Sequence, residues 1–265
     1  MIRQAPYLTV RANANSLTVT FHDHFSDRAA QYVRSRPGYP PELVDYLADI
    51  APEAERVWEA GCGSGQLTRV LAAAFRHVVA CDPSVPQLAH ARREHGVTYC
   101  CATAEASALA NASVDLVVAA QAAHWFELQR FYQEAMRVGR SGAVIALVSY
   151  GVTEVTPDVD VVIRDFHTRV LGSYWPPERK HVDAGYRTLE FPFAEIAAPS
   201  FNMQKEWALS DMLNYADTWS AVRAMLQDGG EEKLEDFRDK IARAWPEGAT
   251  LPVRWPLVVK VGRLP

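Results

Sequence analysis

The chain has 265 residues, of which 49% are apolar, enough to bury one large core and unlike two independent domains. Its net charge is −5 and its arginines are scattered, which disfavours a general nucleic-acid-binding protein. It contains no apolar run of about eighteen residues and opens with no signal-peptide pattern, so we expect a cytoplasmic protein with no membrane partner.

Apolar periodicity predicts two helices, over residues 24–36 and 40–50, as an N-terminal helical cap covering residues 1–50. Strands and helices then alternate over residues 51–151. The predicted strands cover residues 56–60, 77–82, 97–101, 114–122 and 143–151, and the predicted helices 64–75, 84–95 and 128–139. Short, uniformly apolar strands are typical of parallel sheets that are buried on both faces, so the pattern indicates a doubly wound α/β sheet.

The pattern changes after Tyr150. A helix is predicted over residues 158–171, and residues 172–200 lack periodicity, so we interpret residues 152–200 as an insertion or lid. Residues 201–265 carry a strand at 201–209, helices around 210–226 and 231–245, and a last strand at 253–264. The expectation is a single domain, residues 1–265, built on a mostly parallel sheet of seven strands.

The four cysteines are Cys62, Cys81, Cys100 and Cys101, and they show neither a CxxC spacing nor a partner histidine pair. They predict buried free thiols and no zinc site. The sequence FHDHF places His22 and His24 two residues apart, but no third and fourth ligand accompanies them, so no metal is predicted.

The segment VWEAGCGSGQL places Gly61, Gly63 and Gly65 at the end of the first predicted strand. In a doubly wound sheet this turn directs backbone N–H groups into the crevice at the strand ends, and glycine allows a ligand close to the main chain. A tight turn without a ligand is the alternative. The spacing GxGxG differs from the GxGxxG of dinucleotide folds.

Asp82 ends the second predicted strand. A carboxylate there is suited to accept hydrogen bonds from both hydroxyls of a ribose. A helix N-cap is the alternative, and the two roles are compatible.

Three quoted stretches, VWEAGCGSGQLTRVLA, VVACDPSVPQLAHA and AEASALANASVDLVVAAQAAHWF, resemble the class I S-adenosylmethionine-dependent methyltransferases, which have a Rossmann-like fold. HFSDRAAQYVRSRPGYP, YWPPERKHVDAGYRTLEFPF and VRWPLVVKVGR further resemble the type-11 branch that includes trans-aconitate and cantharidin methyltransferase-like proteins. The resemblance implies S-adenosyl-L-methionine as cofactor and methyl transfer to a small molecule, with a carboxylate or hydroxyl as the expected acceptor group. Oligomeric state stays open.

The resemblance also implies roles for individual residues. The cofactor-binding positions that match are Tyr32, Arg36, Glu59, Gly61, Gly63, Gly65, Asp82, Ala104, Glu105, Gln121 and Ala122. Thr103 replaces an aspartate that is frequent in the family, so the corresponding adenine contact is not expected.

His124 follows the fourth strand and is the candidate catalytic base, with a purely structural hydrogen bond as the alternative. The candidate substrate residues are His24, Trp125, Tyr174, Trp175, Arg179 and Arg187. Core packing is the alternative for each aromatic residue and surface ion pairing for each arginine.

Three other functions remain as alternatives. One is an RNA methyltransferase, and the segment QAAHWF argues against it because it lacks the Asn/Asp-Pro-Pro-aromatic motif of base-nitrogen methyltransferases. Another is a nicotinamide-dependent oxidoreductase, and the glycine spacing argues against it. A non-catalytic cofactor-binding protein is the third alternative.

Overall fold

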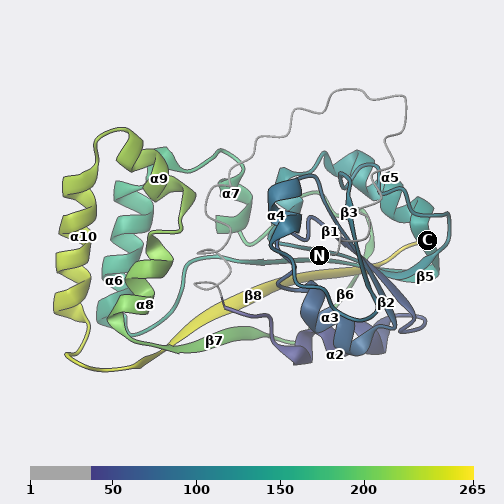
Figure 1. Ribbon diagram of the computed structural model, residues 1–265, viewed down its shortest axis with the longest axis horizontal. Coiled ribbons are helices and arrows are strands. Elements are labelled where there is room, and N and C mark those ends of the chain that lie inside the picture. Colours follow the sequence, from purple (N-terminus) through teal and green to yellow (C-terminus); the bar gives the residue numbers. More distant parts are fainter. Residues whose placement is uncertain (1–36) are drawn as a thin grey trace, which may run out of the picture.

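The computed structural model describes residues 37–265 (Figure 1). The helix predicted over residues 24–36 and the candidate residues His24, Tyr32 and Arg36 lie outside the described part.

Helices and strands alternate through the first half of the described chain. The strands are β1 (Arg56–Ala60), β2 (His77–Asp82), β3 (Val97–Cys101), β4 (Val114–Ala120), β5 (Gly139–Tyr150), β6 (Ala194–Ile196), β7 (Asn202–Trp207) and β8 (Leu251–Arg263). The α-helices are α2 (Pro41–Ile50), α3 (Thr68–Ala74), α4 (Val85–Ala89), α5 (Leu128–Val138), α6 (Pro157–Asp165), α7 (Arg179–Asp183), α8 (Leu209–Ala216), α9 (Ser220–Gln227) and α10 (Glu231–Ala244). Shorter helical turns are η2 (Ala123–Trp125), the π-helical η3 (Phe166–Val170) and η4 (Gly172–Tyr174).

Seven strands form a sheet in the order β3-β2-β1-β4-β5-β8-β6. Strands β1 to β5 pair in parallel, whereas β8 is antiparallel to both β5 and β6. The predicted mostly parallel, Rossmann-like sheet of seven strands is confirmed. The strands that make up this sheet differ from the predicted ones, because β6 lies in the segment predicted to lack periodicity and β7 pairs with β8 alone.

Both faces of the sheet are buried, as the apolar strands predict. In β5, Val144, Ala146 and Val148 pack on the same face as α2 and α3, while Ile145 and Leu147 pack against α5 on the other face. This alternation follows from the two-residue period of a strand.

The first half of β8 extends beyond the seven-stranded sheet, where it pairs with β7. Figure 1 shows α6, α8, α9 and α10 gathered at that end, and we call these four helices the helical unit. Trp255 of β8 is fully buried there and donates from Nε1 to the hydroxyl of Tyr215 in α8 at 3.1 Å. The helical unit is thereby joined to the sheet by a buried aromatic contact.

Two predicted helices differ in extent. The helix predicted over residues 84–95 ends at Ala89, because the polar residues that follow lie exposed and add no apolar surface to the core. The helix predicted around residues 210–226 is divided into α8 and α9 by a turn at residues 217–219.

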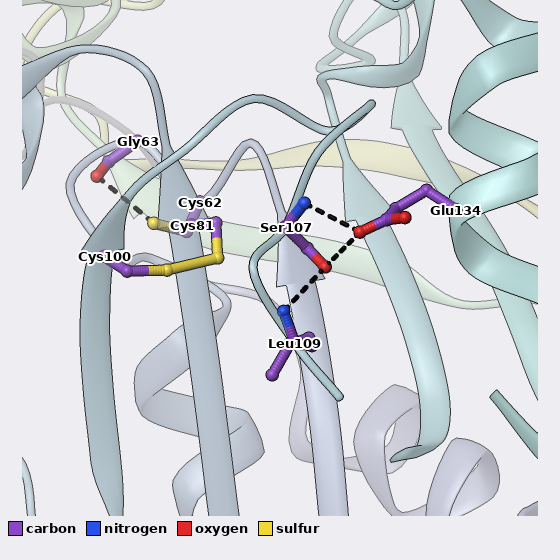
Figure 2. The surroundings of a disulfide bond; sticks show 7 residues. All are labelled: Cys62, Gly63, Cys81, Cys100, Ser107, Leu109 and Glu134. Atoms are coloured by element: carbon purple, nitrogen blue, oxygen red, sulfur yellow. Dashed lines mark hydrogen bonds between the residues drawn. A yellow bond between two sulfur atoms is a disulfide. The ribbon is translucent and has the colours of Figure 1, made fainter. Parts of the chain in front are cut away.

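The prediction of four free thiols is wrong. Cys81 and Cys100 form a disulfide between β2 and β3, beside Cys62 and Gly63 of the loop after β1 (Figure 2). The two residues are register partners in adjacent parallel strands, 4.9 Å apart at Cα, which lies in the range that a disulfide needs. Cys62 and Cys101 are free thiols.

Within residues 37–265, no helix combines the length and apolar character required to cross a membrane. The same residues contain no group of three or more metal-binding side chains.

Candidate active site

The loops after β1 and β2 meet at the carboxyl edge of the sheet. The Asp82 carboxylate accepts a hydrogen bond from the Gly63 backbone N–H through Oδ2 and another from the Ser84 N–H through Oδ1, both at 2.8 Å. Ser84, rather than Asp82, caps α4. Asp82 is thus held by main-chain donors from two loops at the end of β2.

The glycines of the loop after β1 differ in what surrounds them. A Cβ at Gly61 would lie 2.6 Å from the Cβ of Ala122, so this glycine allows the loops after β1 and β4 to touch. A Cβ at Gly63 would meet only the side chain of Gln87, at 4.0 Å. Gly63 has φ +54 and therefore presents bare main chain to open space beside Asp82.

Glu59 lies beneath this loop and is 2% exposed. The pKa of its carboxyl is raised to about 8, because burial and the nearby charge of Asp82 outweigh the opposing effect of a hydrogen bond from the Thr68 hydroxyl. Glu59 is therefore largely protonated near neutral pH.

The loop after β3 is tied to the loop after β4. The Glu105 carboxylate accepts the Glu127 N–H at 3.0 Å through Oε1, and Ala104 is buried in the cluster on the α5 face. These contacts fix the position of Glu105 near the carboxyl edge.

Gln121 follows β4 in the left-handed backbone region, at φ +53. Its Nε2 donates to the Tyr150 carbonyl at 2.8 Å and links the ends of β4 and β5. Its Oε1 is buried and has no partner among residues 37–265. A buried amide oxygen without a donor is a position for a ligand or an ordered water.

A pocket lies between this edge and the helical unit, and we call it the edge pocket. Its wall at the strand ends includes Gln121, His124, Trp125 and Tyr150. Its opposite wall includes His167, Trp175, Arg179, Tyr215 and Trp219. Half of its described lining residues carry aromatic rings, and these residues include one arginine and no Asp or Glu.

A family described as a methyltransferase domain matches residues 58–147. A Dictyostelium discoideum protein named as a methyltransferase is 31% identical over 229 residues, covering 85% of this chain and 87% of its own. A solved structure from Anaeromyxobacter dehalogenans, of a protein described by name as a type II methyltransferase, shares 43% identity, with a TM-score of 0.82, over 86% of this chain and 98% of that one. A Saccharomyces cerevisiae protein named as an S-adenosylmethionine-dependent methyltransferase is 30% identical over 131 residues, 46% of this chain and 45% of its own.

The chain belongs to the class I S-adenosylmethionine-dependent methyltransferases. The matched segment contains most of β1, all of β2 to β4 and most of β5, together with Gly63, Asp82 and Gln121. The residues at the carboxyl edge are therefore those of the methyltransferase core.

His124 of the methyltransferase lies at the mouth of the edge pocket and is held by Tyr186. Its Nδ1 is 2.9 Å from the fully buried Tyr186 hydroxyl. Burial, together with the charge of Arg179, lowers the pKa of His124 to about 3. The imidazole is therefore neutral at physiological pH. Because the buried hydroxyl needs an acceptor for its proton, we assign Tyr186 as donor, which places the imidazole proton on Nε2.

The fold brings some of the predicted substrate residues together in the edge pocket and places others elsewhere. His124, Trp125, Trp175 and Arg179 line the edge pocket. Tyr174 is not among its lining residues, and its hydroxyl donates to Asp228 at 3.0 Å. Arg187 is exposed and does not line the pocket. The cofactor and substrate roles of the matched residues stay predictions.

The prediction missed His167, Tyr215 and Trp219. A signal for His167 was present, since it lies four residues after Ile163 and eight after Val159, on the buried stripe of α6 and η3. A histidine in an apolar stripe marks a buried polar group. No local pattern distinguishes Tyr215 and Trp219 from ordinary core residues.

Proposed function

We propose that this methyltransferase transfers a methyl group to a small-molecule acceptor, a carboxylate or a hydroxyl, bound in the edge pocket. The observation that carries the proposal is the position of Gln121 and His124. They line the pocket and also follow the core strand β4, next to the loop of Gly61 and Gly63. An acceptor in the pocket would thus lie beside the cofactor loops, as direct transfer requires.

The residues at the carboxyl edge fit S-adenosylmethionine. Asp82 is a carboxylate suited to the ribose hydroxyls, and the open main chain at Gly63 allows the nucleoside to approach closely. We assign Glu105 and Ala104 to the adenine side and Gln121 and Ala122 to the methionine side. When bound, the cofactor supplies a methyl group already activated on a sulfonium.

The protein's part is alignment and exclusion of water. The aromatic walls of the edge pocket remove solvent from the reacting groups. A carboxylate acceptor needs no base because it is ionised at neutral pH. For a hydroxyl acceptor, the proposed catalytic contribution of His124 would come from the neutral imidazole.

Two finer assignments belong to the same proposal. Residues 152–200 supply part of one wall of the pocket and are proposed to act as a lid, within the single domain expected from the sequence. The type-11 branch is proposed on the sequence signatures quoted above, and the cytoplasmic location stated as an expectation in the sequence analysis is proposed with it. Hydrogen exchange of α6 and α7 with and without ligands tests the lid.

Mass spectrometry of a metabolite extract tests the function. The extract is incubated with purified protein and a donor that carries a deuterated methyl group. We expect one or a few small acids or alcohols to gain the labelled methyl group, and Asp82→Asn to reduce the product about tenfold or more through weaker cofactor binding. Asp45→Asn, an exposed change on α2, is the matched control. Transfer only to RNA or protein would contradict the proposal, and binding without any transfer would favour a non-catalytic role.

Calorimetry separates this function from a nicotinamide-dependent oxidoreductase. The protein should bind S-adenosylhomocysteine and not NADH, and Gly63→Val should abolish the binding because a branched side chain fills the open space beside Asp82. Binding of NADH instead would reverse the assignment.

A further inference from the structure

Arg179 is held rigidly in the wall of the edge pocket. Its Nε donates to Asp183 at 2.9 Å, and its guanidinium lies 4.7 Å from the centre of the Trp175 ring. Its Nη2 lies 3.2 Å from Nε2 of His167. An arginine fixed in its plane by three neighbours is prepared to bind a carboxylate with little further loss of freedom.

The contact with Arg179 determines which nitrogen of His167 carries the proton. A guanidinium only donates hydrogen bonds, so Nε2 accepts and the proton of the neutral ring is on Nδ1. Burial, together with the charge of Arg179, lowers the pKa of His167, which keeps the ring neutral. The side chain is 3% exposed, and Nδ1 has no hydrogen-bond partner among residues 37–265. A buried N–H beside a pocket is thus left without an acceptor.

Among the described lining residues of the edge pocket, Arg179 is the one cation and no acid is present, and the carboxylate that pairs with Arg179, Asp183, lies outside the lining and contacts Nε. In the assigned tautomers His167 and His124 each carry one N–H. This set of donors complements one anionic group. A polycarboxylate would bring two or more negative charges to a single arginine, at a cost in repulsion and desolvation.

The group next to the donors is expected to be flat. The His167 ring lies 4.7 Å from the Trp175 ring and 5.7 Å from the Trp219 ring, and the two indoles are 6.0 Å apart. Tyr215 lines the same wall. Aromatic walls of this kind favour a planar, aromatic ligand body, which can stack or contact them edge-to-face.

We propose that the edge pocket binds a planar aromatic acid with one carboxylate, and that this carboxylate is held by the guanidinium of Arg179 and the Nδ1–H of His167. The proposal rests on the proposed function, because it takes the edge pocket as the acceptor site. Arg179 and His167 are then the residues that determine acceptor specificity.

Three probes test the charge and shape of the ligand. Calorimetry with the S-adenosylhomocysteine complex is carried out with 2-naphthoate, its neutral amide, and propane-1,2,3-tricarboxylate. We expect 2-naphthoate to bind about tenfold or more tightly than either of the others, as for one charge-assisted hydrogen-bonded pair. Equal binding of the amide, or tighter binding of the tricarboxylate, would overturn the proposal.

Two variants of His167 distinguish the loss of its Nδ1–H donor from a general effect on folding. An asparagine places an amide N–H near the former Nδ1, whereas a glutamine places its amide near the former Nε2. His167→Gln should therefore weaken 2-naphthoate about tenfold and His167→Asn should retain most of the affinity. Arg179→Gln should weaken 2-naphthoate binding at least as much, and the exposed control Arg243→Gln on α10 should have no effect.

Affinity for S-adenosylhomocysteine, measured on every variant, reports whether the cofactor site is folded. If the wild type does not bind S-adenosylhomocysteine, the proposed function fails. If the wild type binds S-adenosylhomocysteine but His167→Gln, Arg179→Gln and the wild type bind 2-naphthoate equally, only the proposed binding of a carboxylate by Arg179 and His167 fails. If 2-naphthoate binds as expected and the extract yields no methylated product, that carboxylate site stands and the methyl-transfer proposal fails.

Discussion

At the scale of single residues, two glycines of one loop have different reasons for being glycine. Both have positive φ, +70 at Gly61 and +54 at Gly63. Gly61 also faces the Cβ of Ala122 at 2.6 Å, whereas nothing lies within 4.0 Å of the Cβ position at Gly63 except Gln87. Glycine at position 61 allows the loops after β1 and β4 to pack together, whereas glycine at position 63 leaves space for a ligand.

Alanine at these two positions should therefore have unequal effects. Gly63→Ala should cost about 1 to 2 kcal/mol of unfolding free energy, the price of a non-glycine residue in the left-handed region. Gly61→Ala should cost that amount plus about 1 to 3 kcal/mol for the contact with Ala122. Urea unfolding of both variants gives the comparison. If the two lose equal stability, the loops after β1 and β4 do not touch as described.

At the scale of elements, the register of two strands decides the state of the cysteines. Cys81 and Cys100 face each other across β2 and β3, and their neighbours Asp82 and Cys101 are the next register pair. Sequence spacing cannot predict this pairing, because a CxxC pattern indicates only local geometry and these cysteines are 19 residues apart. The prediction of free thiols failed for that reason.

Thiol labelling checks the register. Protein denatured without reductant should react with iodoacetamide at Cys62 and Cys101, and reaction at Cys81 and Cys100 should require reduction first. Peptide mapping should recover one cross-linked pair. Cys101→Ser is the matched control, since it removes a neighbouring thiol and leaves the bridge. Labelling of all four cysteines without reductant would contradict the disulfide.

The contact between β8 and the helical unit gives a second test at this scale. Trp255 is fully buried, donates to Tyr215, and lies 4.8 Å from the Trp207 ring. Trp255→Ala should cost about 3 to 5 kcal/mol by leaving a cavity. Trp255→Phe should cost less because a ring remains, and amide hydrogen exchange should show the excess opening in α8. If the loss of amide protection were confined to β1 to β5, this tryptophan would not join the helical unit to the sheet.

At the scale of the whole molecule, the sequence predicted the core better than the pocket. The strands β1 to β5 follow from short apolar runs, and Gly63 and Asp82 from their places at strand ends. The three residues of β6 are too few to show a period. The edge pocket combines residues from η2, η3, α7 and α8, which only tertiary packing brings together. Arg179 was named from the sequence as a candidate substrate residue and His167 was missed, and their contact could not be predicted because they lie on separate elements, α7 and η3.

The pH dependence of stability also belongs to the whole molecule, because buried groups in different parts act in opposite directions. His124 and His167 have folded pKa values below the usual 6.5. The unfolded chain therefore binds more protons at these two sites below about pH 6.5, and their contribution to stability is lost as the pH falls. Glu59 has a folded pKa of about 8 against a usual 4.5. Its contribution is present at low pH and is lost as the pH rises from about 4.5 to 8.

These signs predict a stability maximum near pH 6.5. Between about pH 4.5 and 6.5 the two histidines outweigh the single glutamic acid, so stability rises with pH, and between about pH 6.5 and 8 Glu59 acts alone and stability falls. Glu59→Gln retains an acceptor for the Thr68 hydroxyl and removes the titration, so its unfolding free energy should level off above about pH 6.5. Urea unfolding of both proteins from pH 5 to 8.5 measures the two curves. Parallel curves for the wild type and Glu59→Gln would mean that Glu59 is ionised in the folded protein, and that the loop beneath Gly63 holds a second negative charge beside Asp82.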